Sequence, residues 1–138
     1  MKNIFIDTNI IIDFLADRIP YSEYAAILFQ LAKEKKITIF ISAISINNTY
    51  YILRKVTSHK KALNLISEIL EYIVIQETND EIIKKAIKSN FNDFEDAIQY
   101  YSAVQLNIID IITTRNIKDF KKSDLPVLSP ETTVKVLL

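Results

Sequence analysis

Short apolar runs rich in isoleucine alternate with longer segments of helical periodicity along the whole chain. The runs, each short enough for a buried strand, are Ile4–Ile6, Ile37–Ile41, Ile73–Ile75, Ile108–Ile112 and Val127–Leu128. Apolar residues at helical spacing mark Tyr21–Lys33, Ile44–Arg54, Lys60–Glu71, Asp80–Lys88 and Glu95–Val104. Strands that alternate with helices are joined by right-handed crossovers. The pattern therefore predicts an α/β fold, a three-layer α/β/α sandwich with a mostly parallel central sheet.

The length and continuity of the chain indicate a single domain. Its 138 residues match the usual size of one domain, and no repeat, low-complexity tract or flexible linker interrupts them. No apolar run approaches the ~20 residues that a membrane span needs. The N-terminus leads straight into a strand, without the pattern of a signal peptide. We therefore expect one domain over residues 1–138, in the cytoplasm and without membrane association.

Several kinds of chemistry are excluded by what the sequence lacks. It contains no cysteine and no glycine, which rules out disulfides, thiolate zinc sites and glycine-rich phosphate loops. The single histidine, His59, lies in a polar stretch typical of a helix start, which favours a solvated surface residue over a catalytic base. With 17 basic and 17 acidic side chains the net charge is zero, so nucleic-acid binding would have to depend on local charge.

Acidic and amide side chains recur where strands end or helices begin. Asp7 directly follows the first strand, Asp93 and Asp96 open the last predicted helix, and Asn116 and Asp119 follow the fourth strand. Ligands of α/β proteins bind in the crevice outside the carboxyl ends of the strands. We therefore expect these residues to meet in one crevice, with Asp7 and Asp96 as close neighbours.

Each of these residues also has a purely structural interpretation. Asp7 and Asp93 suit the N-cap of a helix, and an acid such as Asp96 is favoured in a first helical turn. Asn116 and Asp119 are common turn residues. What favours a site is their number, because several carboxylates held together repel one another unless a cation neutralises them.

Oxygen ligands without histidine or cysteine select Mg²⁺ or Mn²⁺ over zinc. Such ions suit the hydrolysis of phosphodiesters, since they activate water and stabilise the leaving oxygen. Candidates for a basic wall along a nucleic-acid backbone, each also explained as an ordinary solvated charge, are Arg54, Lys55, Arg115, Lys118, Lys121 and Lys122. Glu95 should point away into solvent. The helix aromatics, interpreted as core residues, are Tyr50, Tyr51, Tyr100 and Tyr101.

Four motifs in this order resemble the PIN-domain family, which includes the VapC-like toxins of bacterial toxin–antitoxin pairs. They are Ile6-Asp7-Thr8-Asn9, Ser42-Ala43-Ile44-Ser45, Asp96-Ala97 and Thr114-Arg115-Asn116-Ile117-Lys118-Asp119-Phe120. Each motif alone is a weak signal, but four at compatible spacing over nearly the whole chain are strong. The resemblance implies an endoribonuclease that depends on Mg²⁺ or Mn²⁺. It also implies an RNA substrate, a homodimer and a small antitoxin protein that covers the acidic groove.

The resemblance also implies roles for individual residues. Asp7, Asp96 and Asp119 match metal-binding positions, and Asn116 matches a polar position of the last motif. The implied supporting residues are Thr8, Asn9, Ser45, Asp93 and Thr114. One departure concerns Asn48, which stands where the family typically places a glutamate, so that the site loses one anionic ligand. Asp93 or Glu95 would be placed to compensate for it.

Two other functions remain open on the sequence alone. If Asn48 makes the site degenerate, the same fold would serve as an RNA-binding or protein-interaction module. Similar carboxylates in a closed pocket would instead suit a metal-dependent phosphohydrolase acting on small phosphate esters.

Overall fold

A computed structural model describes residues 1–138 and contains a five-stranded sheet in which every strand pair is parallel. The strands are β1 (Lys2–Ile6), β2 (Ile37–Ser42), β3 (Val74–Gln76), β4 (Ile111–Thr113) and β5 (Val127–Leu128), in the spatial order β3-β2-β1-β4-β5. The predicted α/β class and the parallel sheet are confirmed. No helix is long and apolar enough to cross a membrane.

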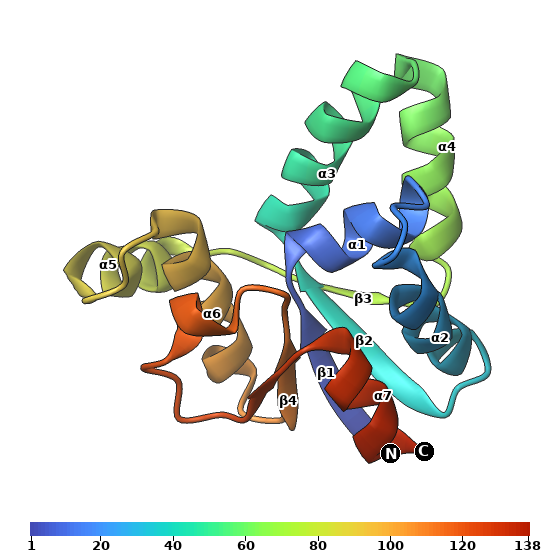
Figure 1. Cartoon of the computed structure of the whole chain (residues 1–138). Coiled ribbons are helices and arrows are strands. Elements are labelled where there is room, and N and C mark those ends of the chain that lie inside the picture. Colours follow the sequence, from blue (N-terminus) through green and yellow to red (C-terminus); the bar gives the residue numbers. More distant parts are fainter.

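Helices connect the strands and cover both faces of the sheet (Figure 1). They are α1 (Thr8–Leu15), α2 (Ser22–Lys33), α3 (Ala43–Val56), α4 (His59–Ile69), α5 (Asp80–Lys88), α6 (Phe94–Leu106) and α7 (Pro130–Leu137), with a short 3₁₀ helix, η1 (Ile117–Phe120), after β4. The bounds of α5 are those predicted. Helix α7 was not predicted, although Ser129 as N-cap followed by Pro130 is a typical helix start.

Alternating side chains of the strands build two cores. On β1, Ile4 and Ile6 face the core that α1, α2 and α7 cover, whereas Phe5 faces the core beneath α6. All three side chains are fully buried. Helices α3 and α4 form an arm that rises from the carboxyl edge of the sheet, and α5 packs beside α6 (Figure 1). The molecule is thus a three-layer sandwich with an added helical arm.

The fourth strand is shorter than the sequence suggested. The predicted strand Ile108–Ile112 begins in the structure only at Ile111, because Asn107 ends α6 in the left-handed conformation and the next residues form the turn into the sheet. Ile108 is half exposed in this turn. The backbone N–H of Asn3 donates to Asp110 Oδ2 at 2.7 Å, which fixes the turn against β1.

The strand order reverses between β1 and β4. From β1 the chain runs outward through β2 and β3, and it then returns to add β4 and β5 on the other side. Asp7 follows β1 and Thr114 follows β4, so the two residues stand side by side where the order changes. In open α/β sheets such a switch point is where ligands bind.

Candidate active site

A cavity of about 400 Å³ opens at the carboxyl end of the sheet, at this switch point. Its eleven lining residues are Asp7, Thr8, Asn9, Asn48, Tyr51, Ile52, Asp93, Glu95, Asp96, Asn116 and Asp119. Five of them carry a carboxyl group and none is basic. The predicted meeting of Asp7 and Asp96 in one crevice is therefore confirmed.

Asp7 is held firmly at the floor of the cavity. Its side chain is 3% exposed, Oδ1 accepts a hydrogen bond of 2.7 Å from the Thr8 backbone N–H, and Oδ2 accepts one of 2.8 Å from the Thr114 hydroxyl. Asp7 is also the N-cap of α1, so the structural interpretation holds alongside its place in the cavity. Burial raises the pKa of the Asp7 carboxyl, and Asp119 and Asp93 raise it further, against the lowering by the two hydrogen bonds.

Asp96 reaches the cavity from the opposite wall. A helix that connects parallel strands runs against their direction, so the N-terminus of α6 lies over the carboxyl edge of the sheet (Figure 1). Asp93 caps α6 by accepting a hydrogen bond of 2.9 Å from the Asp96 backbone N–H. Burial, followed by the charges of Asp7 and Asp93, raises the pKa of the Asp96 carboxyl to about 7. Burial and the neighbouring carboxylates thus both favour the protonated form of Asp96, and burial is the larger cause.

Glu95 does not point into solvent, and the expectation that it would was wrong. It is half-buried, and its Oε1 accepts a hydrogen bond from Asn48 Nδ2 while its Oε2 accepts one of 3.5 Å from the Thr8 hydroxyl. Burial, followed by the charge of Asp7, raises the pKa of the Glu95 carboxyl. Polar donors on α1 and α3 thus draw Glu95 into the cavity wall.

A buried polar network supports the cavity from below. Thr8 Oγ1 and Ser45 Oγ share a hydrogen bond of 2.8 Å, and Gln99 Nε2 donates to both, at 3.0 Å and 2.6 Å. Sequence reasoning identified Thr8 and Ser45 but not Gln99, which is 1% exposed. Its spacing of four residues from Glu95, and of three from Asp96, would have placed it on the same helix face.

The loop after β4 contributes the remaining polar residues. Asn116 and Asp119 line the mouth of the cavity and are exposed, whereas Thr114 lies buried beneath Asp7 and also accepts a hydrogen bond of 3.0 Å from the Asn116 backbone N–H. Asn9 and Asp93 line the cavity as well. All the acidic, amide and hydroxyl residues proposed from the sequence for the site are thus in the cavity or directly beneath it.

A buried ion pair fixes this loop and was not found from the sequence. Asp13 on α1 is fully buried, and its Oδ2 lies 2.8 Å from Arg115 Nε, while its Oδ1 lies 3.8 Å from Arg18 Nη1. The Arg115 guanidinium also stacks on the Tyr21 ring, 3.8 Å from its centroid. Burial raises the pKa of the Asp13 carboxyl by more than the two arginines lower it. Arg115 is therefore a structural residue and not part of a free basic wall.

Two other interpretations change with the structure. Tyr51 is 53% exposed and lines the cavity, so its assignment to the core was wrong, whereas Tyr100 is buried as expected. Lys122 is tied to the backbone by a hydrogen bond of 3.0 Å from its Nζ to the Asn90 carbonyl oxygen. Lys118 and Lys121 remain exposed on either side of Asp119.

The donor set of the cavity suits a hard divalent cation. It offers carboxylate and amide oxygens and no sulfur or imidazole, which favours Mg²⁺ or Mn²⁺. No group of three or more acidic, histidine or cysteine side chains converges closely enough to hold an ion by themselves. Mg²⁺ commonly keeps several waters and binds through one or two carboxylates, so the residues present fit such an ion.

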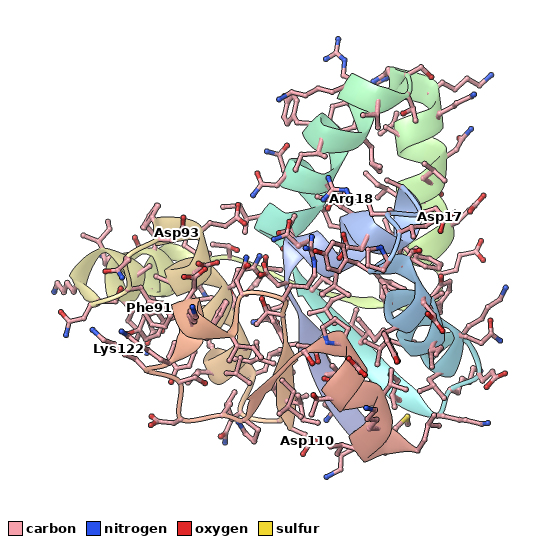
Figure 2. The ribbon with its side chains drawn as sticks, in the orientation of Figure 1. Asp17, Arg18, Phe91, Asp93, Asp110 and Lys122 are labelled. Atoms are coloured by element: carbon pink, nitrogen blue, oxygen red, sulfur yellow. The ribbon has the colours of Figure 1, made fainter.

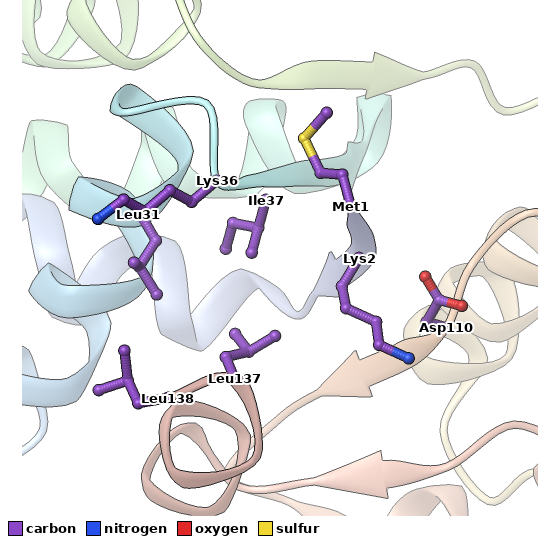
Figure 3. Close-up of a pocket in the computed structure, with 8 residues that line it drawn as sticks. All are labelled: Met1, Lys2, Leu31, Lys36, Ile37, Asp110, Leu137 and Leu138. Atoms are coloured by element: carbon purple, nitrogen blue, oxygen red, sulfur yellow. The ribbon is translucent and has the colours of Figure 1, made fainter.

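A second cavity, of about 430 Å³, lies at the opposite end of the sheet (Figure 3). It is lined mostly by apolar side chains with Lys2, Lys36 and Asp110, and Asp110 is its single acid. Figure 2 shows Asp110 at the lower edge of the molecule, well away from Asp93. The chemistry-bearing residues are therefore confined to the carboxyl edge of the sheet.

Comparison with known proteins agrees with this architecture. A parallel sheet with carboxylates gathered at its switch point defines the class of α/β proteins with an acidic ligand site. The family model described as PIN domain matches residues 3–118. The chain belongs to the PIN-domain family.

The reported relatives each match more than nine-tenths of the chain. It is 30% identical over 135 residues to the protein named Ribonuclease VapC1 of Aquifex aeolicus (strain VF5), an alignment that covers 94% of this chain and 92% of that protein. A DNA-bound VapBC structure from Salmonella typhimurium matches with a TM-score of 0.71 at 14% identity, over 94% of this chain and 99% of that one. A toxin–antitoxin complex from Klebsiella pneumoniae matches with a TM-score of 0.65 at 24% identity, over 91% of this chain and 96% of that one. At these identities the two structures establish the shared fold.

Proposed function

We propose that the protein is a metal-dependent endoribonuclease that hydrolyses RNA phosphodiester bonds and acts as the toxin of a toxin–antitoxin pair. The observation that carries the proposal is the cavity at the switch point, whose lining includes five carboxyl groups and no basic side chain. Their mutual repulsion is relieved by a bound cation. Membership in the PIN-domain family and the relative named Ribonuclease VapC1 support RNA hydrolysis as the reaction.

The toxin role is supported by the proteins that share the fold. The matching structures include VapBC assemblies and a toxin–antitoxin complex. We infer by analogy a small antitoxin protein as partner, and a homodimer as the assembled state. An acidic cavity with exposed rim residues offers a partner's basic side chain a place to bind.

In this proposal Asp7, Asp96 and Asp119 surround Mg²⁺ or Mn²⁺, with one or two of them binding the ion directly and the rest acting through its waters. A bound ion of this kind supplies the positive charge that lowers the pKa of a water molecule and stabilises the leaving oxygen. Asp7 is pre-oriented for the role, because Thr8 and Thr114 fix both of its oxygens. Asn116 and Asn48 offer amide groups that orient water or the scissile phosphate.

The exposure of the cavity rim favours a polymer over a small phosphate ester. Asp93, Asn116 and Asp119 are all exposed, so an extended strand can cross the cavity without entering a closed pocket. Lys118 and Lys121 are exposed in and directly after the 3₁₀ helix that carries Asp119, and they are the candidates for contacts to the substrate's phosphates. A small-molecule phosphohydrolase would need walls that these residues do not provide.

The test is cleavage of labelled single-stranded and structured RNA with Mn²⁺, with Mg²⁺ and with a chelator. We expect cleavage that requires the metal and that is lost in Asp96→Asn. The matched control is Asp124→Asn, which removes an exposed carboxylate at the other end of the sheet. RNA binding without cleavage under any metal condition would instead favour the RNA-binding module, and the proposal would fail.

A further inference from the structure

We propose that Glu95 supplies the carboxylate that position 48 lacks, and that Asn48 is the positioning residue that holds Glu95 toward the ion. This inference rests on the proposed metal-dependent function. The site would then keep its full number of anionic groups, with one of them moved from α3 to the first turn of α6.

Both oxygens of Glu95 are held by neutral donors. Asn48 Nδ2 donates to Oε1 and the Thr8 hydroxyl donates to Oε2, and no lysine or arginine forms a salt bridge with Glu95. A carboxylate placed among Asp7, Asp93 and Asp96 without a cation costs Coulomb energy. An unconstrained glutamate at the rim would turn into water. Because Glu95 instead stays in the cavity wall beside other acids, we infer that its carboxylate faces a site for a cation.

The partner at position 48 has to be a donor for this arrangement to exist. The Asn48 side chain is half-buried in the cavity wall, whereas that of Asn47 is exposed, so Asn48 is the residue of this pair that faces the site. An amide donates to a carboxylate, but an ionised glutamate at the same position would repel Glu95. Asn48 and Glu95 therefore form a complementary pair, in which the charge is carried by the second member alone.

The packing of α6 against α3 fixes the direction in which Glu95 points. Gln99 lies one helical turn after Glu95 and shares its face, and Gln99 Nε2 reaches Ser45 on α3 at 2.6 Å. This face of α6 is therefore turned toward α3 and α1. Asp93 caps the helix and fixes the first turn on which Glu95 stands. Glu95 is held by its element as well as by its own hydrogen bonds.

The test is calorimetric titration of the metal-free protein with Mn²⁺, which reads metal affinity without reference to RNA cleavage. We expect Glu95→Gln to weaken Mn²⁺ binding by at least about tenfold, because hard cations gain affinity with the charge of their ligands. Asn48→Ala, which removes the donor and frees Glu95, should weaken binding by about threefold. The double variant Asn48→Glu with Glu95→Gln returns the charge to α3 and should bind within about threefold of the wild type.

Glu81→Gln is the matched control, since Glu81 is the second residue of α5 as Glu95 is of α6, and it is exposed away from the cavity. Its Mn²⁺ affinity should equal that of the wild type. Thermal melting of each metal-free variant shows that the fold is kept, and the double variant tests the idea even if one single variant fails to fold.

The outcomes separate this inference from the proposed function. A wild-type protein that binds no Mn²⁺ would overturn the metal-dependent function itself. Binding by the wild type that is unchanged in Glu95→Gln would overturn the role of Glu95 and leave the function standing. Loss of binding in Glu95→Gln without recovery in the double variant, or unchanged binding in Asn48→Ala, would overturn the pairing with Asn48.

Discussion

Asp96, to which we assign a catalytic role, destabilises the metal-free protein. Its carboxyl group is 8% exposed and stands near four other acids, and its pKa is raised to about 7. In the metal-free protein at pH 8 this group is ionised, and its ionisation lowers the free energy of unfolding. Asp96→Asn should raise the free energy of unfolding in chelator by about 1–2 kcal/mol, after allowance for solvent screening. The same variant should lose metal-dependent cleavage, and urea denaturation with an RNA assay on one sample checks both.

The sign of the pH dependence follows from the same pKa. Asp96 binds its proton more tightly in the folded state than in the unfolded chain, whose pKa is near the ordinary 3.8. Its contribution to stability is thus fully present below pH 4 and is lost as the pH rises through about 7. Metal-free wild type should be more stable at pH 5 than at pH 8, and Asp96→Asn should flatten this difference. A wild-type stability that rises between pH 5 and pH 8 would contradict the prediction.

The buried pair of Asp13 and Arg115 makes a separate prediction. Arg115→Ala leaves Asp13 buried with only the more distant Arg18, and should cost about 3 kcal/mol of unfolding free energy at pH 8. Because loss of the guanidinium raises the pKa of Asp13 further, this deficit should shrink as the pH falls toward 4.

The matching double variant of this pair is Asp13→Leu with Arg115→Met. It replaces both partners by apolar groups and should recover most of the stability, since burial of the pair is not fully offset by attraction. Urea denaturation of both variants at two pH values is the measurement. A double variant as unstable as Arg115→Ala would show that the pair is needed for the fold itself.

At the scale of elements, the N-terminus of α6 connects helix stability to the site. Asp93 accepts the hydrogen bond of the Asp96 backbone N–H and so fixes the turn that carries Glu95 and Asp96. Asp93→Ala should cost about 1 kcal/mol of unfolding free energy through loss of the cap, and should also weaken Mn²⁺ binding. Asp93→Asn keeps a cap and removes a charge that repels Asp7 and Asp96, so in chelator it should be at least as stable as the wild type. Equal melting temperatures for the two variants would show that the cap does not order this turn.

Regular elements were predictable from the sequence because their signals are local. Helical spacing gave the bounds of α5, and the apolar run Val127–Leu128 gave β5. The parallel order followed from alternation of strands and helices, which leaves few arrangements. Asp7 and Asp96 could be paired in advance, because a strand end and the start of a crossover helix meet at the same edge of a sheet.

The features that the sequence did not predict depend on contacts between elements that are distant in the chain. The direction of Glu95 is set by Asn48, which lies 47 residues away, and the burial of Asp13 depends on Arg115, 102 residues away. No periodic pattern in the sequence predicts either of these two contacts. Tyr51 was assigned to the core because its helix is amphipathic, but α3 belongs to an arm that leaves one side of the helix uncovered (Figure 1).

At the scale of the whole molecule, charge is balanced overall and separated locally. The net charge is zero, yet the carboxyl edge of the sheet gathers five acids in one cavity. No global field attracts RNA, so the proposed RNA binding would depend on local cations. Lys118 and Lys121 are suitable, because they are exposed and lie in and directly after η1, on either side of Asp119.

The double variant Lys118→Ala with Lys121→Ala should therefore weaken RNA binding and reduce its dependence on salt. Each phosphate contact on a single strand contributes about 0.7 to the slope of log affinity against log salt, so loss of two contacts should lower the slope by about 1.4. Fluorescence anisotropy of labelled RNA over a salt series, in an Asp96→Asn background that prevents cleavage, gives the slope. The control is Lys2→Ala with Lys36→Ala, which removes two exposed lysines at the other end of the sheet (Figure 3). Equal slopes for the two double variants would place the RNA on another face of the molecule.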